Sequence, residues 1–327
     1  MLATLGIAGA LLHTANHALF KSLLFLGSGA IGRGSGTRDI DALGGLARRM
    51  PWTWGAFLIA SIAIVGLPPL NGFVSEWTIA LALLAGLDAP GAVRTLTAGL
   101  VGLGLIGGLA LACFTKVDGA MFLGEPRTRA ARDAREVGAL MRGPMVALAA
   151  ACVALGLFLA LALDPALRVA TALTSSSSAA LAPALAALAA GATRVSWLAL
   201  LFVAMLLAAA LLRNGLLRRR ILVEETWACG YPVTTPRMQH TAASFAAPLL
   251  ATFGRLAGLR VERTARSFAT RPVDLILDRA ARPLWRRLND GAARLRWMQS
   301  GRLHEYLLYV LATLAILLVY LGARGIR

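Results

Sequence analysis

Three titratable side chains recur at four-residue intervals near the start of the chain: His13, His17 and Lys21. In a helix this spacing places them on one side. They lie in an apolar run, residues 9–31, that holds no other charged residue. Ionisable groups inside such segments usually mark ion or proton paths. Because a neutral imidazole can donate at one nitrogen and accept at the other, the pattern predicts a proton relay.

Lysine is rare in this sequence. Lys21 and Lys116 are the only lysines among 33 basic residues, and both lie in apolar segments. Burial readily lowers the pKa of a lysine, whereas arginine stays charged. We therefore include Lys116 in the predicted relay. Asp118 is a possible further member, although residues at i and i+2 do not face each other on a helix.

The composition indicates an integral membrane protein. The chain is 58% hydrophobic and 15% charged, with a mean hydropathy of +0.69, which excludes an ordinary soluble globular protein. The cysteines Cys113, Cys152 and Cys229 lie far apart without CxxC or Cys/His spacing, which argues against a disulfide framework or a zinc site. The N-terminus lacks the basic region and cleavage site of a signal peptide, and the chain begins directly in apolar sequence.

Two short apolar runs, residues 52–67 and 73–87, flank a proline- and glycine-rich stretch. Each run has about fifteen residues, whereas about twenty are needed to cross a bilayer. Together they predict one crossing helix that is broken in the middle. Such breaks occur at cavities and ion sites, where the freed backbone groups find partners. The residues assigned to the break are Pro68, Pro69, Asn71 and Gly72.

Glu76 follows this break directly. We expect Asn71 to cap the second half-helix, which would place Glu76 near its first turns, where the helix dipole favours an anion. Glu76 is therefore a candidate site residue at the break. The polar neighbours Asn16 and Ser75 are possible further members of the site.

Further apolar segments complete an all-α, polytopic membrane fold with about six transmembrane helices. The segments are residues 93–123, 143–163, 195–212 and 303–321. Residues 164–194 stay ambiguous, since 182–192 is apolar but short. The predicted domains are a transmembrane half (1–213), a basic cytoplasmic-face segment (214–302) and a C-terminal membrane helix (303–327).

The placement of arginine explains the net charge of +17. If the broken helix crosses once and residues 182–192 do not cross, the loops that follow residues 31, 123 and 212 all fall on one side. These loops hold most of the basic residues. The positive-inside rule makes that side cytoplasmic, which predicts a multi-pass protein of the bacterial inner membrane and removes the need for a nucleic-acid partner.

The basic segment 214–302 contains apolar residues at helical spacing, among them Trp285, Leu288, Ala292 and Leu295. This pattern is typical of an amphipathic helix at the membrane surface. A basic loop without order is the alternative. Residues 224–238 are rich in turn formers, and we expect an ordered segment there rather than a catalytic one.

Several motifs resemble the proton-translocating antiporter-type subunits. This family includes subunits L, M and N of respiratory complex I, the Mrp antiporters and the large membrane subunits of energy-converting hydrogenases. The motifs are HTANHALFKSLLFLGSG at 13–29, GGLARRMP at 44–51 and LPPLNGFVSEW at 67–77. TWACGYP at 226–232 and TPRMQ at 235–239 are more similar to the branch with hydrogenase-4 component B and formate hydrogenlyase.

The resemblance implies a specific arrangement. Family members hold two inverted five-helix repeats, each with a broken helix, and a line of Lys, His and Glu across the mid-membrane. It implies that His13, His17 and Lys21 form the central relay of the second repeat and that Glu76 lies at the exit. The first repeat is absent, so the chain would be about the C-terminal half of a family member, with a bracing lateral helix in 214–302.

The resemblance also implies partners: other membrane subunits and a peripheral hydrogenase or dehydrogenase arm, together with the lipid bilayer. The chain has no flavin, quinone, haem, iron–sulfur or nucleotide motif, so we expect no cofactor here and assign any redox reaction to the partner subunits. The sequence leaves open whether H⁺ or Na⁺ is transported.

Two alternatives remain. The chain could be a structural brace that lacks transport. It could also be an intramembrane metalloenzyme, since His13 and His17 have the i, i+4 spacing of a zinc helix; however, no Glu follows His13 and no third ligand is evident.

Overall fold

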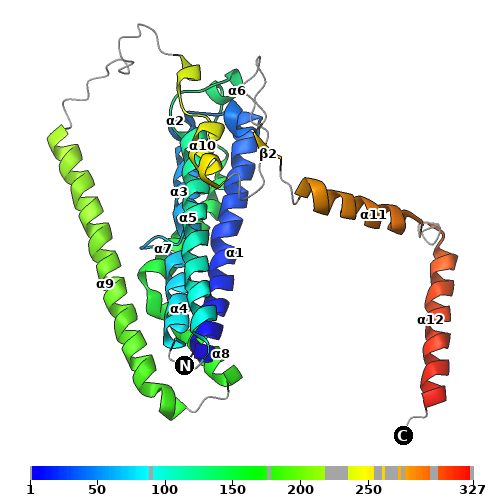
Figure 1. Ribbon diagram of the computed structural model, residues 1–327. Coiled ribbons are helices and arrows are strands. Elements are labelled where there is room, and N and C mark those ends of the chain that lie inside the picture. Colours follow the sequence, from blue (N-terminus) through cyan, green and yellow to red (C-terminus); the bar gives the residue numbers. More distant parts are fainter. Residues whose placement is uncertain are drawn as a thin grey trace. The chain divides into compact units, whose positions relative to one another are not determined.

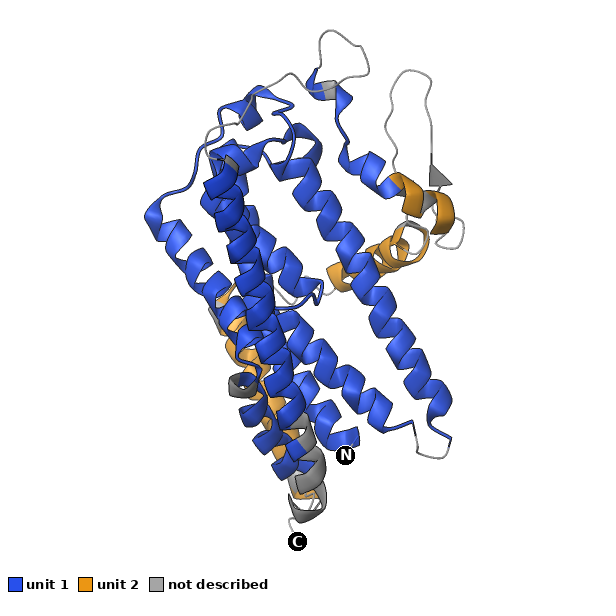
Figure 2. Ribbon diagram, turned by 90° about the vertical axis from the view of Figure 1, so that its left-hand side faces the viewer, with its two compact units in different colours: residues 1–246 blue, residues 247–327 orange. Residues whose placement is uncertain are grey.

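The computed structural model describes residues 2–87, 91–174, 178–217, 235–253, 260–261, 272–273, 277–294 and 301–324. The chain divides into two compact units, residues 1–246 and 247–327 (Figure 2). Most of the turn-rich segment predicted at 224–238 lies outside the described residues.

The first unit is a helical bundle in which α1, α3, α4, α5 and α7 run alongside one another (Figure 1). Its helices are α1 Leu2–Ser35, α2 Leu46–Arg49, α3 Pro51–Ile64, α4 Asn71–Ala85, α5 Val93–Phe122, α6 Arg129–Arg132, α7 Ala139–Leu157, α8 Leu159–Thr174 and α9 Ser178–Leu217, followed by the start of α10 Ala242–Phe253. α1 packs on α3, α4, α7 and α8 and so forms the centre of the unit.

The second unit contains the helices α11 Arg282–Ala293 and α12 Leu303–Arg324. Two two-residue strands, β1 Arg260–Val261 and β2 Pro272–Val273, pair antiparallel with Arg260 opposite Val273. α11 contains the predicted apolar residues Trp285 and Leu288, both exposed among arginines, as expected for an amphipathic helix.

Among the described residues, three helices are both long and apolar enough to cross a membrane: α5, α7 and residues Ala189–Leu216 of α9. Shorter apolar helices cover Pro51–Ile64, Asn71–Ala85, Ala242–Phe253 and His304–Tyr320. α1 has 34 residues, and its polar side chains lower its hydropathy. The prediction of an all-α, polytopic membrane protein is confirmed.

The predicted helix break is present, with one correction. α3 ends at Ile64 and α4 begins at Asn71. Asn71 does not cap α4: the N-cap residue is Leu70, and Asn71 is the first helical residue. Its side chain is instead directed to α1, where it donates to Asn16 Oδ1 at 3.1 Å. A tertiary hydrogen bond has taken the place of the expected local one.

Two predicted boundaries are also corrected. The expected span 143–163 is divided, because α7 ends at Leu157, Phe158 is non-helical and α8 begins at Leu159. The turn lets Leu159 and Leu163 pack in a buried cluster with the start of α1. The expected span 195–212 is part of the longer helix α9, whose alanine-rich first half has a high helix propensity.

Three buried clusters follow one another along α1. The first contains Leu5 and Leu12, packed with residues of α4 and α8. The second contains Phe20 with Leu70 at the helix break. The third contains Leu24 and Ile31 with residues of α3, α5 and α7. The predicted relay therefore lies where α1 passes the broken helix.

The loop before α7 fixes the start of α3. Glu136 accepts hydrogen bonds from the backbone N–H groups of Trp52 (2.9 Å) and Thr53 (3.2 Å) and from the Thr53 hydroxyl (2.5 Å). A carboxylate at a helix N-terminus satisfies unpaired N–H groups and interacts favourably with the helix dipole. As a result, α3 and α7 begin at the same level.

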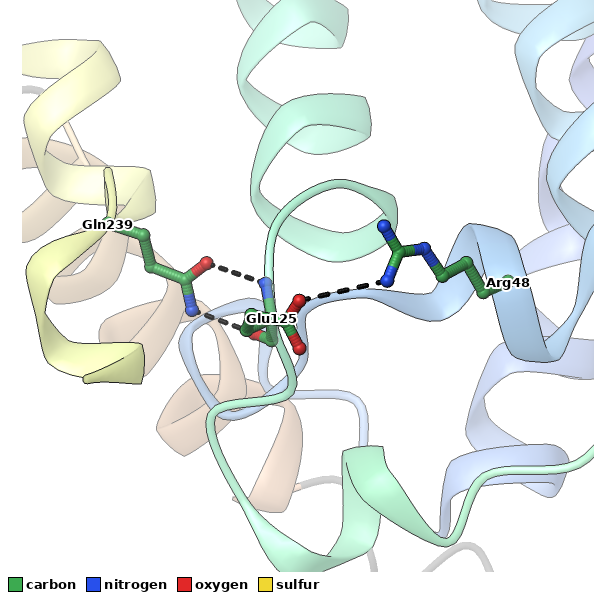
Figure 3. A network of polar contacts seen from close by, with 3 residues as sticks. All are labelled: Arg48, Glu125 and Gln239. Carbon is green, nitrogen blue, oxygen red and sulfur yellow. Dashed lines mark hydrogen bonds and ion pairs between the residues drawn. The ribbon is translucent and has the colours of Figure 1, made fainter. Parts of the chain in front are cut away.

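A strap from residues 235–241 is anchored on the same end of the bundle. The Gln239 amide donates to the Glu125 carbonyl at 2.7 Å and accepts from its N–H at 2.9 Å, while Arg48 lies 3.8 Å from the Glu125 carboxylate (Figure 3). Arg127 donates to the carbonyls of Leu43, Ala120 and His240. These contacts hold the start of α10 against the α5–α6 loop.

Candidate functional site

His13 is connected to the helix break by a chain of hydrogen bonds. Its Nδ1 lies 3.0 Å from Ser75 Oγ of α4, and the Ser75 hydroxyl donates to the Gly72 carbonyl at 3.0 Å. A hydroxyl has only one proton to donate. When its proton is directed to the Gly72 carbonyl, Ser75 accepts from His13, which places the proton on Nδ1 of the neutral imidazole and leaves Nε2 as a proton acceptor.

A second polar pair fixes the same junction. Asn16 and Asn71 are both fully buried. The Asn16 amide donates to the Asn71 carbonyl at 2.8 Å, and the Asn71 amide donates to Asn16 Oδ1 at 3.1 Å. This reciprocal pair joins α1 to the start of α4. Cys152 of α7 lies beside Asn71, and Asn71 Oδ1 is buried without a hydrogen-bond partner among the described residues.

Glu76 lies on the second turn of α4, and its carboxylate turns back to the break. A Cβ atom at Gly66 would collide with the Glu76 carboxylate, and the φ of Gly66 is +74°. The positive φ favours a glycine at position 66, and a side chain there would also displace the Glu76 carboxylate. Glu76 is half-buried, and no hydrogen bond or ion pair joins it to His13, His17 or Lys21 in the part of the chain that the structure describes.

His17 and Lys21 lie in a different setting from His13. Both are exposed and line an open hollow of about 540 Å³ together with Ala18, Ser22 and Phe25. The Lys21 ammonium lies 5.9 Å from the centroid of the Phe25 ring, within the range of a cation–π contact. The centroids of the His13 and His17 rings are 5.9 Å apart, so His17 is the nearest member of the relay to His13.

Lys116 and Asp118 belong to another part of the bundle. Asp118 of α5 lies beside Ser61 of α3. Asp118 Oδ1 and Ser61 Oγ are buried, and neither has a hydrogen-bond partner within the described ranges. Lys116 is half-buried, two residues away. Asp118 thus lies beside a hydroxyl of the broken helix, and no ion pair joins it to Lys116 within the described residues.

The sequence-predicted residues form three groups, of which His17 and Lys21 at the exposed hollow are one. His13, Asn16, Asn71 and Ser75 meet at one junction, with Glu76 at the adjoining break. Lys116 and Asp118 lie elsewhere. Sequence reasoning missed Ser61, a single hydroxyl in an apolar run, and Gly66, whose position before the two prolines was the available signal. No group of three metal-binding side chains occurs among the described residues, so His13 and His17 lack a third zinc ligand there.

The chain is similar to several known membrane proteins. Residues 1–100 match the family described as NADH:quinone oxidoreductase/Mrp antiporter, TM. Over 98% of its length the chain is 38% identical to hydrogenase-4 component B of Escherichia coli, of which it covers 50%. Over 46% of its length it is 44% identical to formate hydrogenlyase subunit 3 of Escherichia coli, of which it covers 25%.

The chain spans about half the length of the curated relatives that match along nearly all of it. A solved structure shares the fold: 96% of the chain aligns with 48% of a chain in the membrane-bound sulfane sulfur reductase, an archaeal respiratory membrane complex, with a TM-score of 0.57 and 22% identity. The chain is therefore a homologue of hydrogenase-4 component B that spans half of its length, and its first hundred residues match the family described as NADH:quinone oxidoreductase/Mrp antiporter, TM.

Proposed function

We propose that the chain translocates protons, as one subunit of an energy-converting hydrogenase or NADH-quinone-oxidoreductase-type complex in the bacterial inner membrane. The observation that carries the proposal is the hydrogen-bonded chain from His13 through Ser75 to the Gly72 carbonyl. It connects a titratable helix to a helix break beside Glu76. The Gly72 carbonyl can only accept, so these bonds orient His13 at the break, and the proton itself would reach Glu76 through water.

In this proposal Lys21 and His17 exchange protons along α1, and His13 receives them at Nε2. The 5.9 Å between the two imidazole centroids leaves the rings in reach of each other directly or through one water. Glu76 is the next acceptor, beyond the break. Asp118 and Ser61 form a side branch, since two unsatisfied polar atoms in an apolar interface are suited to holding a water.

The partners follow from the relatives. The curated relatives are named as components of hydrogenase-4 and formate hydrogenlyase. We propose that this chain assembles with other membrane subunits and with a peripheral hydrogenase or dehydrogenase arm that carries the redox cofactors. The arginine-rich loops face the cytoplasm, and H⁺ rather than Na⁺ is the transported ion, since imidazoles relay protons and do not bind Na⁺.

Lys21 provides the test. The complex would be purified with the chain from its native membranes, reconstituted in proteoliposomes and assayed for proton uptake. Lys21→Arg keeps the positive charge but cannot release a proton, so we expect transport to fall as far as in Lys21→Ala while the complex still assembles. Arg33→Lys, at the exposed end of α1, is the matched control.

The competing proposal is that the chain is a structural brace without transport. Assembly of the Lys21→Ala complex with undiminished proton uptake would favour that alternative. Equal transport by wild type and Lys21→Arg would exclude proton release from Lys21.

A further inference from the structure

A groove runs between α3 and α7 on the outside of the first unit. Its volume is about 540 Å³, and its lining is apolar, with Trp52, Gly55 and Ile59 from α3 and Val146, Val153 and Leu157 from α7. Trp52 is 56% exposed and Val146 42% exposed. The groove lies apart from the His13–Ser75 junction and plays no part in the proposed proton path.

The length of the groove matches one leaflet of a bilayer. Val146 and Leu157 are three helical turns apart, which is about 16 Å along α7. The hydrocarbon core of a bilayer is about 30 Å thick, so one leaflet occupies about half of it. A single acyl chain laid along α7 would fill the groove from end to end.

A cation precedes the groove on α7, just beyond its lining residues. Arg142 precedes Val146 by one helical turn and therefore shares its side of α7. Arg142 is half-buried, its Nε is buried without a hydrogen-bond partner, and its guanidinium makes no hydrogen bond or ion pair within the described residues. A partly buried guanidinium without an anion is costly, so the geometry calls for a negatively charged group here.

Trp52 indicates that this end of the groove lies at the membrane surface. The backbone N–H of Trp52 donates to Glu136, which lies three residues before α7 begins. We therefore infer that Trp52 and Arg142 lie at a similar height along the bundle. Tryptophan is enriched at the boundary between headgroups and hydrocarbon. The end of the groove with a guanidinium is thus the end that faces the headgroups.

We propose that the α3–α7 groove binds an anionic phospholipid of the cytoplasmic leaflet, with one acyl chain along α7 and the phosphate on the Arg142 guanidinium. Arginine recognises phosphate through paired N–H donors. A zwitterionic lipid offers the same phosphate already neutralised by its own ammonium group, so it binds more weakly. The bound lipid would cover the apolar groove. It would also link α3, the first half of the broken helix, to α7.

The test is photocrosslinking in the intact purified complex. Nanodiscs of mixed phosphatidylglycerol and phosphatidylethanolamine would carry one of the two lipids with a photoreactive acyl chain, and labelled peptides would be identified by mass spectrometry. We expect α3 and α7 peptides to be labelled about tenfold more by phosphatidylglycerol, the factor that corresponds to one hydrogen bond to a charged group.

Two pairs of variants distinguish recognition of the lipid headgroup from binding of the acyl chain. Arg142→Gln should remove the preference for phosphatidylglycerol, whereas Arg135→Gln, an exposed arginine before α7, should leave it unchanged. Ala150→Trp fills the groove and should abolish labelling by both lipids, whereas Ala147→Trp, an exposed alanine of α7 outside the groove, should not. Size-exclusion chromatography would show that each variant complex is assembled.

Equal labelling by both lipids in the wild type would overturn the assignment of an anionic lipid. Labelling that survives Ala150→Trp would place the lipid outside the groove. Absence of labelling together with a protein crosslink from Trp52 to another subunit would show that a protein helix occupies the groove instead.

Discussion

The two ends of the polar stripe on α1 differ in what covers them. His13 is hydrogen-bonded to Ser75 and packed against α4, whereas Lys21, two turns later, is exposed beside Phe25. A spacing of four residues exceeds the 3.6 residues of a helical turn, so each step rotates the next side chain by about 40°. The stripe therefore winds from the packed side of α1 to its outward side, and one sequence pattern produces a fixed end and an open end.

The difference between the packed and the exposed end of α1 should have its largest effect on the stability of the protein. Asn16→Ala leaves the buried Asn71 amide without its acceptor and removes a second hydrogen bond to the Asn71 carbonyl, and a buried group left unpaired costs about 1–3 kcal/mol. We expect a loss of about 3 kcal/mol in the free energy of unfolding, measured by denaturation in detergent. Ser22→Ala, on the outward side, should change it by less than about 0.5 kcal/mol. A similar loss in both variants would contradict the expected difference between the packed and the outward side of α1.

Gly66→Ala tests the break itself. A methyl group there meets the Glu76 carboxylate, and the backbone has a positive φ, so we expect a destabilisation of about 2 kcal/mol. Gly29→Ala is the matched control on α1, where a Cβ would meet open space, and helix propensity predicts a small gain in stability. Thermal unfolding of both variants would check the prediction, and an unaffected Gly66→Ala protein would mean that Glu76 is not held against the break.

A smaller effect is expected at Ser75. Ser75→Ala removes the acceptor for His13 Nδ1–H at a cost of about 1 kcal/mol. The readout is the tautomer of His13, measured by ¹⁵N NMR of histidine-labelled protein, with His13→Gln to assign the signal among the four histidines. The Nδ1-protonated form should dominate in the wild type and give way to a mixture in the variant. An Nε2-protonated wild type would reverse the proposed direction of hydrogen bonding.

Much of this arrangement could be predicted from the sequence. Apolar length and the Pro68-Pro69 stretch located the broken helix, because both act through local physics. Asn71 could not be placed correctly, since its partner Asn16 is 55 residues away and only the packing of α4 on α1 brings them together. The exposure of Lys21 could not be predicted either. Residue spacing shows on which side of a helix a residue lies, but not which other helices pack against that side.

The bend at Phe158 was missed for a related reason. The sequence is apolar on both sides of it, and the turn follows from the burial of Leu159 and Leu163 against the start of α1. Gly156, just before the bend, approaches the backbone of Pro69 so closely that a Cβ atom would not fit. Hydropathy indicates which segments are long and apolar enough to cross a membrane, but it does not report such tertiary contacts.

Proton transport by Glu76→Gln tests the central claim most directly. The reconstituted complex would be assayed for proton uptake and, in the same preparation, for electron transfer, with Glu125→Gln as the control carboxylate at the exposed α5–α6 loop. Glutamine keeps the shape but cannot carry the proton, so we predict that proton uptake per electron falls at least about a hundredfold, while Glu125→Gln matches the wild type. Wild-type proton uptake by an assembled Glu76→Gln complex would contradict a path through the helix break.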